Sequence, residues 1–193
     1  MKNNVSKKEL DEFLGPANTD GLLALKKLNL PKNSTILDVG TGIGISPIFL
    51  ALNGYKVVTG EPETDNSVYA KMDWEANAER FGVKDSISFR AFDASGMPFE
   101  TNSFDAVVFF GTLHHIDESQ RKYVITEGIR VCKFCGYLVF FEPTDEMIVK
   151  IKKKFPDHPM AANPLNSFEF QSIEHIQGKM MNIYLIQNTM IEN

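Results

Sequence analysis

Short apolar runs alternate with amphipathic stretches between residues 34 and 143 of the chain. The apolar runs have the length and composition of buried strands; they read TILDV, YKVVTGE, SISFRAFDA, FDAVVFFGTL and GYLVFFEP. Helical patterns are typical of the stretches between them, SPIFLALNG, NSVYAKMDWEANAERFG and ESQRKYVITEGIRVC. Strands that alternate with helices form βαβ units, so the pattern predicts an α/β fold with a doubly wound, mostly parallel sheet.

Both ends of the chain depart from this alternation. Residues 6–30 favour helices interrupted at a Gly-Pro pair; Asn18 or Thr19 here, and Ser46 in the core, are candidate helix caps. Near the other end, MIVKIKKKF favours a helix, while FEFQSIEHIQ and KMMNIYLIQN favour two strands with a turn at Gly178. Two successive strands without a helix between them predict an antiparallel hairpin at one sheet edge.

The length of 193 residues fits one domain with a single core. Within the domain 1–193 we expect N-terminal helices over 1–32, a ligand-binding core over 33–145, and a C-terminal helix and hairpin over 146–193. The position of the N-terminal helices before the first core strand suggests a lid over the ligand pocket.

The net charge of −5 disfavours a nucleic-acid footprint, which is normally basic. No apolar run approaches the ~18 residues of a membrane span, and the start MKNNVSKKELDEF lacks the apolar region of a secretory signal. Two cysteines do not make a disulfide framework. We therefore expect a cytoplasmic protein without nucleic-acid or membrane partners.

The segment DVGTGIGIS, residues 38–46, joins the first core strand to the helix that follows. Its three alternating glycines would let the backbone turn tightly and approach a ligand at the carboxyl edge of the sheet; a tight turn that binds nothing is the alternative. The dinucleotide pattern G-x-G-x-x-G needs a small residue where this chain has Ile45, and the phosphate-binding G-K-[ST] is absent. Asp38 would repel a pyrophosphate but suits a cation or an amino group.

Two further acidic residues end the next strands. Glu61 lies about 20 residues after Gly40, at the end of the second strand, where a carboxylate can accept two hydrogen bonds from a ribose diol. Asp93 follows the third strand and could accept a hydrogen bond from an exocyclic amine such as that of adenine. The alternatives are a solvent-facing acid at Glu61 and a cap or turn residue at Asp93.

Taken in order, ILDVGTGIG, Glu61, FDASGMPFETNSFDAVVFFGTLHHI and RVCKFCGYLVFFEP resemble the class I S-adenosylmethionine-dependent methyltransferases, in particular small single-domain enzymes that methylate metabolites. The resemblance covers residues 34–145 and implies a Rossmann-like, seven-stranded sheet whose last strand is antiparallel. One departure concerns the turn before the fifth strand, where the family's L-K-P-G-G is replaced by CKFCG.

The resemblance also implies S-adenosylmethionine as cofactor and S-adenosylhomocysteine as product. The acid before the glycine loop would lie near the methionine ammonium, the loop along the methionine and ribose, Glu61 at the ribose hydroxyls, and the residues after the third and fourth strands near the adenine and the sulfonium. The implied cofactor-binding residues are Asp38, Gly40, Thr41, Gly42, Gly44, Glu61, Pro62, Asp93, Ala94, Phe110 and Gly111.

His114 and His115 follow the fourth strand at the same edge and are candidate catalytic bases; shaping the pocket is the alternative role. Methyl transfer from a sulfonium is an in-line displacement that positioning alone can accelerate. Glu142 would contact substrate or cap a turn. The C-x-x-C pair, Cys132 and Cys135, supplies two ligands of the four that structural zinc needs, so we predict a structural role and no metal site.

The resulting hypothesis is methyl transfer from S-adenosylmethionine to a small-molecule acceptor. A protein that binds S-adenosylmethionine or S-adenosylhomocysteine without transferring a methyl group is the first alternative, and a nicotinamide oxidoreductase, disfavoured by Ile45 and Asp38, is the second. A nucleic-acid methylase is disfavoured by the acidic charge and by GTLHH where an Asn/Asp-Pro-Pro-aromatic motif would stand. The resemblance specifies neither the acceptor nor an oligomeric state.

Overall fold

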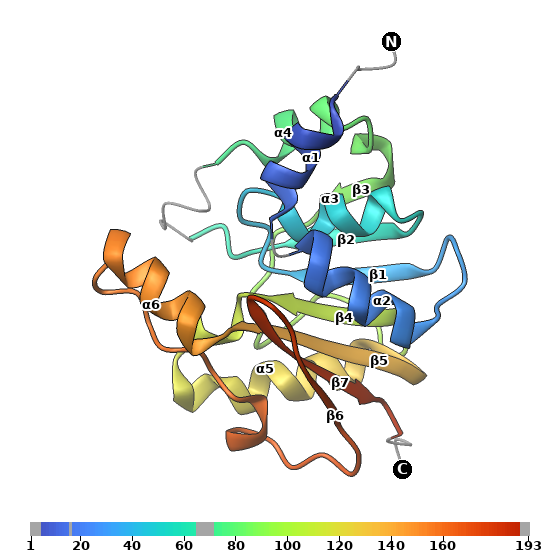
Figure 1. Ribbon diagram of the computed structural model, residues 1–193. Coiled ribbons are helices and arrows are strands. Elements are labelled where there is room, and N and C mark those ends of the chain that lie inside the picture. The colour runs from blue at the N-terminus through green and yellow to red at the C-terminus, as the bar shows by residue number, and fades with distance from the viewer. Residues whose placement is uncertain (1–4, 16, 65–71, 190–193) are drawn as a thin grey trace.

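A seven-stranded sheet in the order β3-β2-β1-β4-β5-β7-β6 forms the centre of the computed structural model, which describes residues 5–15, 17–64 and 72–189 (Figure 1). The strands are β1 (Thr35–Val39), β2 (Lys56–Gly60), β3 (Ile87–Phe89), β4 (Phe104–Phe110), β5 (Cys132–Pro143), β6 (Glu174–Gln177) and β7 (Met181–Gln187). The first five pair in parallel, whereas β7 is antiparallel to both β5 and β6. The predicted doubly wound sheet with a closing antiparallel hairpin is confirmed.

Helices cover both faces of the sheet. They are α1 (Lys7–Leu14), α2 (Leu22–Leu28), α3 (Ile45–Leu52), α4 (Trp74–Arg80), α5 (Glu118–Val131) and α6 (Asp145–Lys154). Successive side chains of β4 point to opposite faces, so Val108 packs in the cluster with α1 to α4 and Phe109 in the cluster with α5. The two faces thus form two separate apolar cores, as expected for a parallel sheet buried on both sides.

Several local expectations differ from the structure. A π-helical turn at Ala17–Gly21 leads directly into α2, which begins without a side-chain cap, so neither Asn18 nor Thr19 caps it. Within the described residues the helix predicted over 66–82 begins at Trp74; its expected first part falls in 65–71, outside the described residues. Ser46 lies inside α3 rather than at its cap, because Gly44 takes that position.

The buried carboxylate of Asp20 joins the two ends of the fold. Its Oδ1 accepts the backbone N–H of Lys179 at 2.9 Å, and its Oδ2 accepts those of Met180 and Met181 at 2.8 and 2.9 Å. Asp20 is 1% exposed, so these donors replace water around its charge. The turn between β6 and β7 is therefore held by a residue that lies before the first strand.

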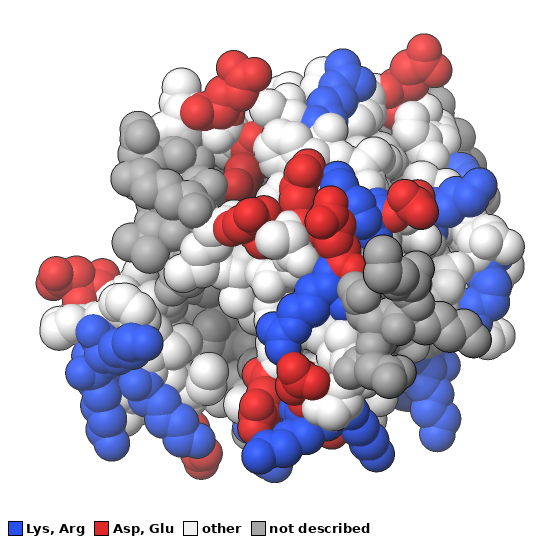
Figure 2. Space-filling view, turned by 90° about the horizontal axis from the view of Figure 1, so that it is seen from above, with Lys and Arg blue, Asp and Glu red and all other residues white. Residues whose placement is uncertain are grey.

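Charged side chains of both signs are spread over the face seen from above, and one group of adjoining basic side chains lies at its lower left edge (Figure 2). No helix in the described ranges is long and apolar enough to cross a membrane.

Candidate functional site

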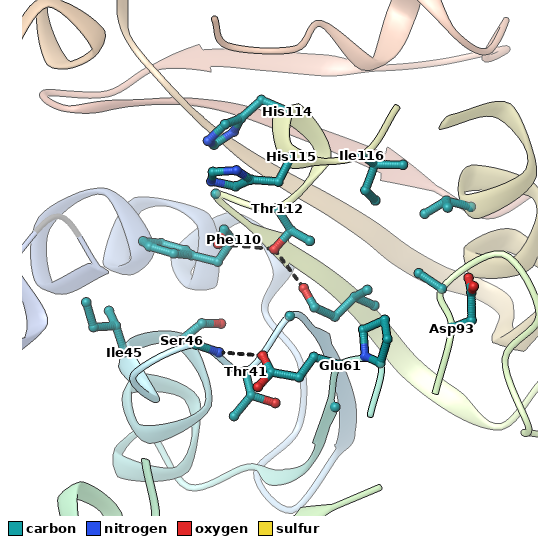
Figure 3. A pocket seen from close by; sticks show the side chains of 18 of the residues that line it. Thr41, Ile45, Ser46, Glu61, Asp93, Phe110, Thr112, His114, His115 and Ile116 are labelled. Atoms are coloured by element: carbon teal, nitrogen blue, oxygen red, sulfur yellow. Dashed lines mark hydrogen bonds between the residues drawn. The ribbon is translucent and has the colours of Figure 1, made fainter. Parts of the chain in front are cut away.

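A cavity of about 900 Å³ opens at the carboxyl ends of the parallel strands. In Figure 3 the side chains from the glycine loop and from β2 face it from one side, and His114 and His115 face it from the other. Among the predicted site residues, those that line it are Gly40, Thr41, Gly42, Glu61, Pro62, Asp93, Ala94, Phe110, Gly111, His114 and His115. Asp38 and Gly44 do not line it, so the structure gathers most but not all of the predicted site at one cavity.

The glycine loop lies against the end of β4. Gly40 has φ 94°, and its N–H donates to the Gly60 carbonyl at 2.9 Å. A Cβ on Gly40 would lie 2.7 Å from Thr112 Oγ1, a separation that real Cβ atoms do not adopt. Gly42 and Gly44 also have positive φ. The local sequence therefore needs glycine to bring this backbone to the cavity wall.

Asp38 lies behind the loop in a buried hydroxyl network. Ser46 Oγ donates to its Oδ1, and Thr59 Oγ1 donates to its Oδ2 at 2.7 Å. Thr41 Oγ1 lies 2.9 Å from Thr59 Oγ1, which extends the network toward the cavity. Burial raises the pKa of Asp38 to about 7, and the nearby Glu61 carboxylate adds to this rise, while the two hydroxyl donors oppose it. Any contact of Asp38 with a ligand in the cavity would pass through these hydroxyl groups or a water.

Glu61 lies beside the backbone of the glycine loop. Its Oε2 accepts the Gly42 N–H at 3.0 Å, which fixes the carboxylate beside the loop backbone (Figure 3). Because Gly42 and Glu61 both line the cavity, a ligand there meets a positioned carboxylate. This arrangement fits the hydrogen-bonding needs of a ribose diol.

Asp93 forms a turn and also borders the cavity. Its Oδ1 accepts the Ser95 hydroxyl at 2.7 Å and the Ser95 N–H at 2.8 Å, and these hydrogen bonds lower its pKa. The turn role given as an alternative is therefore present, together with a place on the cavity wall. The carboxylate stays ionised at neutral pH and can accept a further hydrogen bond.

The far end of the cavity is built by the segment after β4, by α6 and by the loop that follows α6. His114 and His115 lie in a short 3₁₀ turn, Leu113–His115, and Met147 of α6 and His158 beyond it line the same end. No described residue of 1–32 lines the cavity, because α1 and the turn Ala17–Gly21 pack on α3. The lid role stays a prediction, and in this structure α6 takes the place beside the cavity.

Glu142 is fully buried beneath this end. Its Oε2 lies 2.7 Å from Nδ1 of His114 and accepts the Ala162 N–H at 2.9 Å. Sequence reasoning missed this pairing, as it missed His158, because no spacing pattern links β5, the turn after β4 and the loop after α6. The expected alternatives for Glu142, a substrate contact or a turn cap, give way to a side chain that orients His114.

The C-x-x-C pair lies away from the cavity. Cys132 is buried, which raises the pKa of its thiol to about 12, and Cys135 is exposed with φ 61°. A thiol with a raised pKa is a poor nucleophile and metal ligand. The described geometry thus agrees with a structural role.

The sequence pattern of the methyltransferase domain matches residues 37–140, more than half of the chain. The chain belongs to this family. Demethylmenaquinone methyltransferase of Clavibacter sepedonicus is 27% identical over 129 residues, which cover 67% of this chain and 49% of that protein. The 27-O-demethylrifamycin SV methyltransferase of Amycolatopsis mediterranei (strain S699) is 32% identical over 120 residues, 62% of this chain and 42% of that protein. The methyltransferase chain thus spans about half the length of these curated relatives.

The crystal structure of a putative S-adenosyl-L-methionine-dependent methyltransferase from Methanococcus maripaludis has the same fold, with a TM-score of 0.70 and 19% sequence identity. The similarity covers 100% of this chain and 99% of that one. Together with the match to the methyltransferase domain, the shared fold confirms the resemblance to class I S-adenosylmethionine-dependent methyltransferases. At 19% sequence identity this similarity shows a shared fold and does not show a shared activity.

Proposed function

We propose that this chain transfers a methyl group from S-adenosylmethionine to a small-molecule acceptor. The observation that carries the proposal is one continuous cavity that joins the glycine loop and Glu61 at one end to His114 and His115 at the other. Its volume of about 900 Å³ lies within the range of ~300–1,000 Å³ found for small-molecule sites. One cavity can therefore hold a cofactor and an acceptor side by side.

The chemistry of the cavity wall fits this cofactor. Three carboxylates, Glu61, Asp93 and Asp117, line it, and no Lys or Arg does so among the described residues. A phosphate-bearing dinucleotide would need cationic or amide partners and would be repelled by these acids. S-adenosylmethionine carries a sulfonium and an ammonium but no phosphate, so the nicotinamide alternative is disfavoured.

In this proposal each residue of the cavity wall contacts a different part of the cofactor. Glu61 would hold the ribose hydroxyls, Asp93 the adenine amine, and the backbone of Gly40–Gly42 the methionine portion. When bound, S-adenosylmethionine supplies an electrophilic methyl group on a sulfonium. The protein would contribute by holding the acceptor in line with that group and by excluding water, an effect that can account for several kcal/mol of the barrier.

The acceptor end of the cavity favours a small, partly apolar molecule. Apolar side chains from the segment after β4, from α6 and from β7 surround the histidines there; they include Ile116, Met147, Ile151 and Met181. The curated relatives are named for methylation of a demethylmenaquinone and of a demethylrifamycin, both small molecules. These names support an acceptor of the same broad class for this chain.

The test is calorimetric titration with S-adenosylmethionine and S-adenosylhomocysteine. Glu61→Ala should weaken both at least tenfold, about 1.4 kcal/mol. Glu63→Ala is the matched control, because Glu63 is exposed two residues away and does not line the cavity; it should leave affinity unchanged. Equal effects of the two variants, or no binding, would count against the cofactor assignment.

Turnover needs a second measurement. Release of S-adenosylhomocysteine is followed over a panel of small hydroxyl, thiol, amine and carbon acceptors. Turnover of one class supports the proposed transfer. Tight cofactor binding without turnover of any class would favour the alternative, a binding protein that transfers no methyl group.

A further inference from the structure

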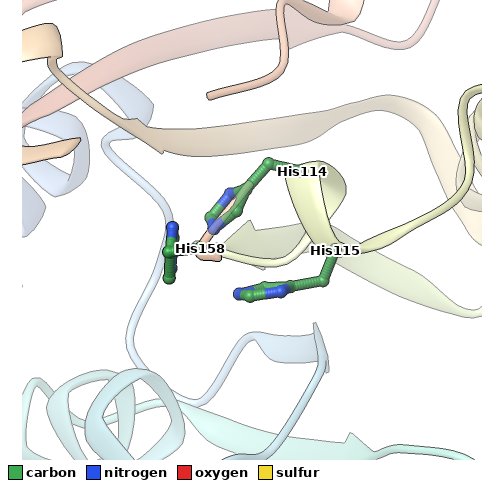
Figure 4. Close-up of side chains that lie close together, drawn as sticks. All are labelled: His114, His115 and His158. Carbon is green, nitrogen blue, oxygen red and sulfur yellow. The ribbon is translucent and has the colours of Figure 1, made fainter. Parts of the chain in front are cut away.

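Three histidines converge at the acceptor end of the cavity. Ligand nitrogens of His114, His115 and His158 all lie within 4.8 Å of one another. The ring centroids are 4.2 Å apart for His114 and His115, and each of these rings is 5.1 Å from that of His158. Figure 4 shows the three imidazoles facing a common point, although they come from two separate segments of the chain.

Hydrogen bonds fix which nitrogen two of these rings present. Nδ1 of His158 lies 2.9 Å from the Pro159 carbonyl, which can only accept, so this nitrogen carries the proton. Nδ1 of His114 lies 2.7 Å from the Glu142 carboxylate and donates to it in the same way. In the neutral rings the lone pair is therefore on Nε2. A carboxylate or carbonyl that holds the distal nitrogen is the usual second shell of a metal-bound histidine.

An unpartnered buried oxygen of Glu142 is a second observation. Its Oε1 has no hydrogen-bond partner among the described residues, and the side chain is fully buried. An unsatisfied buried oxygen costs about 1–3 kcal/mol, more when it is charged. A cation bound at Nε2 of His114 would make Nδ1–H a stronger donor to Oε2 and would stabilise the carboxylate through the ring.

We propose that His114, His115 and His158 bind one divalent transition-metal ion, with Zn²⁺ as the favoured occupant. Three imidazoles and one open position are the ligand set of many catalytic zinc sites. With Zn–N bonds of ~2.0–2.1 Å, tetrahedral binding places the nitrogens about 3.3 Å apart, so the rings would close in by small side-chain rotations. All three residues line the cavity, so the open position faces it.

A role in catalysis rests on the proposed methyl transfer, whereas the metal site itself does not. An acceptor hydroxyl or thiol would bind the ion at the open position and lose its proton to water. The resulting heteroatom then attacks the methyl carbon, and the electron pair of the broken carbon–sulfur bond goes to the sulfonium. His114 and His115 would thus act as ligands in place of general bases.

The experiment uses the full, untagged chain after treatment with a chelator. Titration calorimetry with Zn²⁺ and the visible absorption of added Co²⁺ should both show one ion per chain. His158→Gln and His115→Gln should each weaken Zn²⁺ at least about 100-fold, and Glu142→Gln should weaken it about 10–100-fold. His175→Gln is the matched control, since the fourth histidine stacks on Tyr184 away from the cluster.

The proposal fails if the wild-type chain binds neither ion, or if the His158→Gln and His115→Gln variants bind Zn²⁺ as tightly as His175→Gln. Both titrations are made without S-adenosylmethionine, so they do not depend on the proposed function. Circular dichroism and thermal unfolding of the same variants check that they remain folded. Metal binding without cofactor binding would remove the proposed function and keep the site; the reverse result would remove the site alone.

Discussion

The methyl group of an alanine at position 40 would meet the side chain of Thr112, whose Oγ1 would lie 2.7 Å from it. Thr112 cannot easily move away, because its Oγ1 donates to the Val39 carbonyl at 2.8 Å. The glycine loop and the segment after β4 are thus in contact across the cavity wall. Both segments are expected to hold the cofactor, and a larger side chain at position 40 would push them apart.

Gly40→Ala should therefore destabilise the fold and weaken the cofactor at once. Overpacking and a positive φ together predict a loss of about 1–3 kcal/mol in the free energy of unfolding. Urea denaturation and calorimetric titration measure the two effects. Gly96→Ala is the control, since nothing lies within 4 Å of its added Cβ; it should change stability by less than about 0.5 kcal/mol. Similar losses in both variants would contradict the steric explanation.

The buried Asp38 should make stability fall as pH rises. Burial raises its pKa from 3.8 to about 7 in the folded chain, so between these values the folded state holds a proton that the unfolded state has lost. Stability from this group is fully present below pH 3.8 and declines until about pH 7. This rise in the pKa corresponds to about 4 kcal/mol in the free energy of unfolding.

Asp38→Asn isolates this contribution, because it removes the titrating group and keeps its shape. The unfolding free energy of wild type minus that of the variant should fall by several kcal/mol between about pH 4 and about pH 7. Denaturation in urea at a series of pH values gives this difference. A difference that does not vary with pH would mean that the carboxyl is not desolvated as the structure implies.

The Asp20 carboxylate should contribute strongly to stability. Asp20→Ala leaves three backbone N–H groups of the hairpin turn without their acceptor, and we expect a loss of at least about 3 kcal/mol. Asp20→Asn keeps one acceptor oxygen and should lose less. Asp11→Ala removes an exposed hydrogen bond to Asn18 and should cost less than about 0.5 kcal/mol. A cost for Asp20→Ala no greater than this control would exclude the anchoring role.

Cys135 has φ 61° and lies within β5, at a position where the family commonly has glycine. At this φ a residue with a Cβ is less stable than glycine by about 1 kcal/mol. Glycine loses more conformational entropy on folding, so replacing Cys135 by glycine gains only part of this difference. Cys135→Gly should therefore raise the free energy of unfolding by about 0.5–1 kcal/mol. Cys135→Ala keeps the Cβ and should change little. Thermal unfolding of both variants in reducing buffer would show whether the backbone, and not the thiol, is responsible.

The sheet could be predicted because its signals are local. The apolar runs that become β1, β2 and β4 are continuous and bounded by turn residues, and the glycine loop marks the carboxyl edge. Helix ends were less predictable. Ser46 has a side chain typical of a cap, but its hydroxyl donates to the buried Asp38, and Gly44 takes the cap position instead.

The acceptor end was beyond the reach of sequence patterns. His158 lies in an irregular loop, and Glu142 is the last side chain before a proline at the end of an apolar strand; nothing in their spacing relates them to His114. Their contacts arise when α6 and its loop return across the end of β5. Such a site is assembled by tertiary packing, so it can be recognised only from the three-dimensional structure.

The bond between Asp20 and the β6–β7 turn also bears on how the chain is made. During synthesis Asp20 leaves the ribosome long before residues 179–181, so its carboxylate has none of these partners until they have been made. Over the same interval one edge of β5 remains unpaired, because β7 is its partner. Unpaired edges invite association between chains, so a nascent chain stalled before Met181 would be prone to aggregate or to need a chaperone.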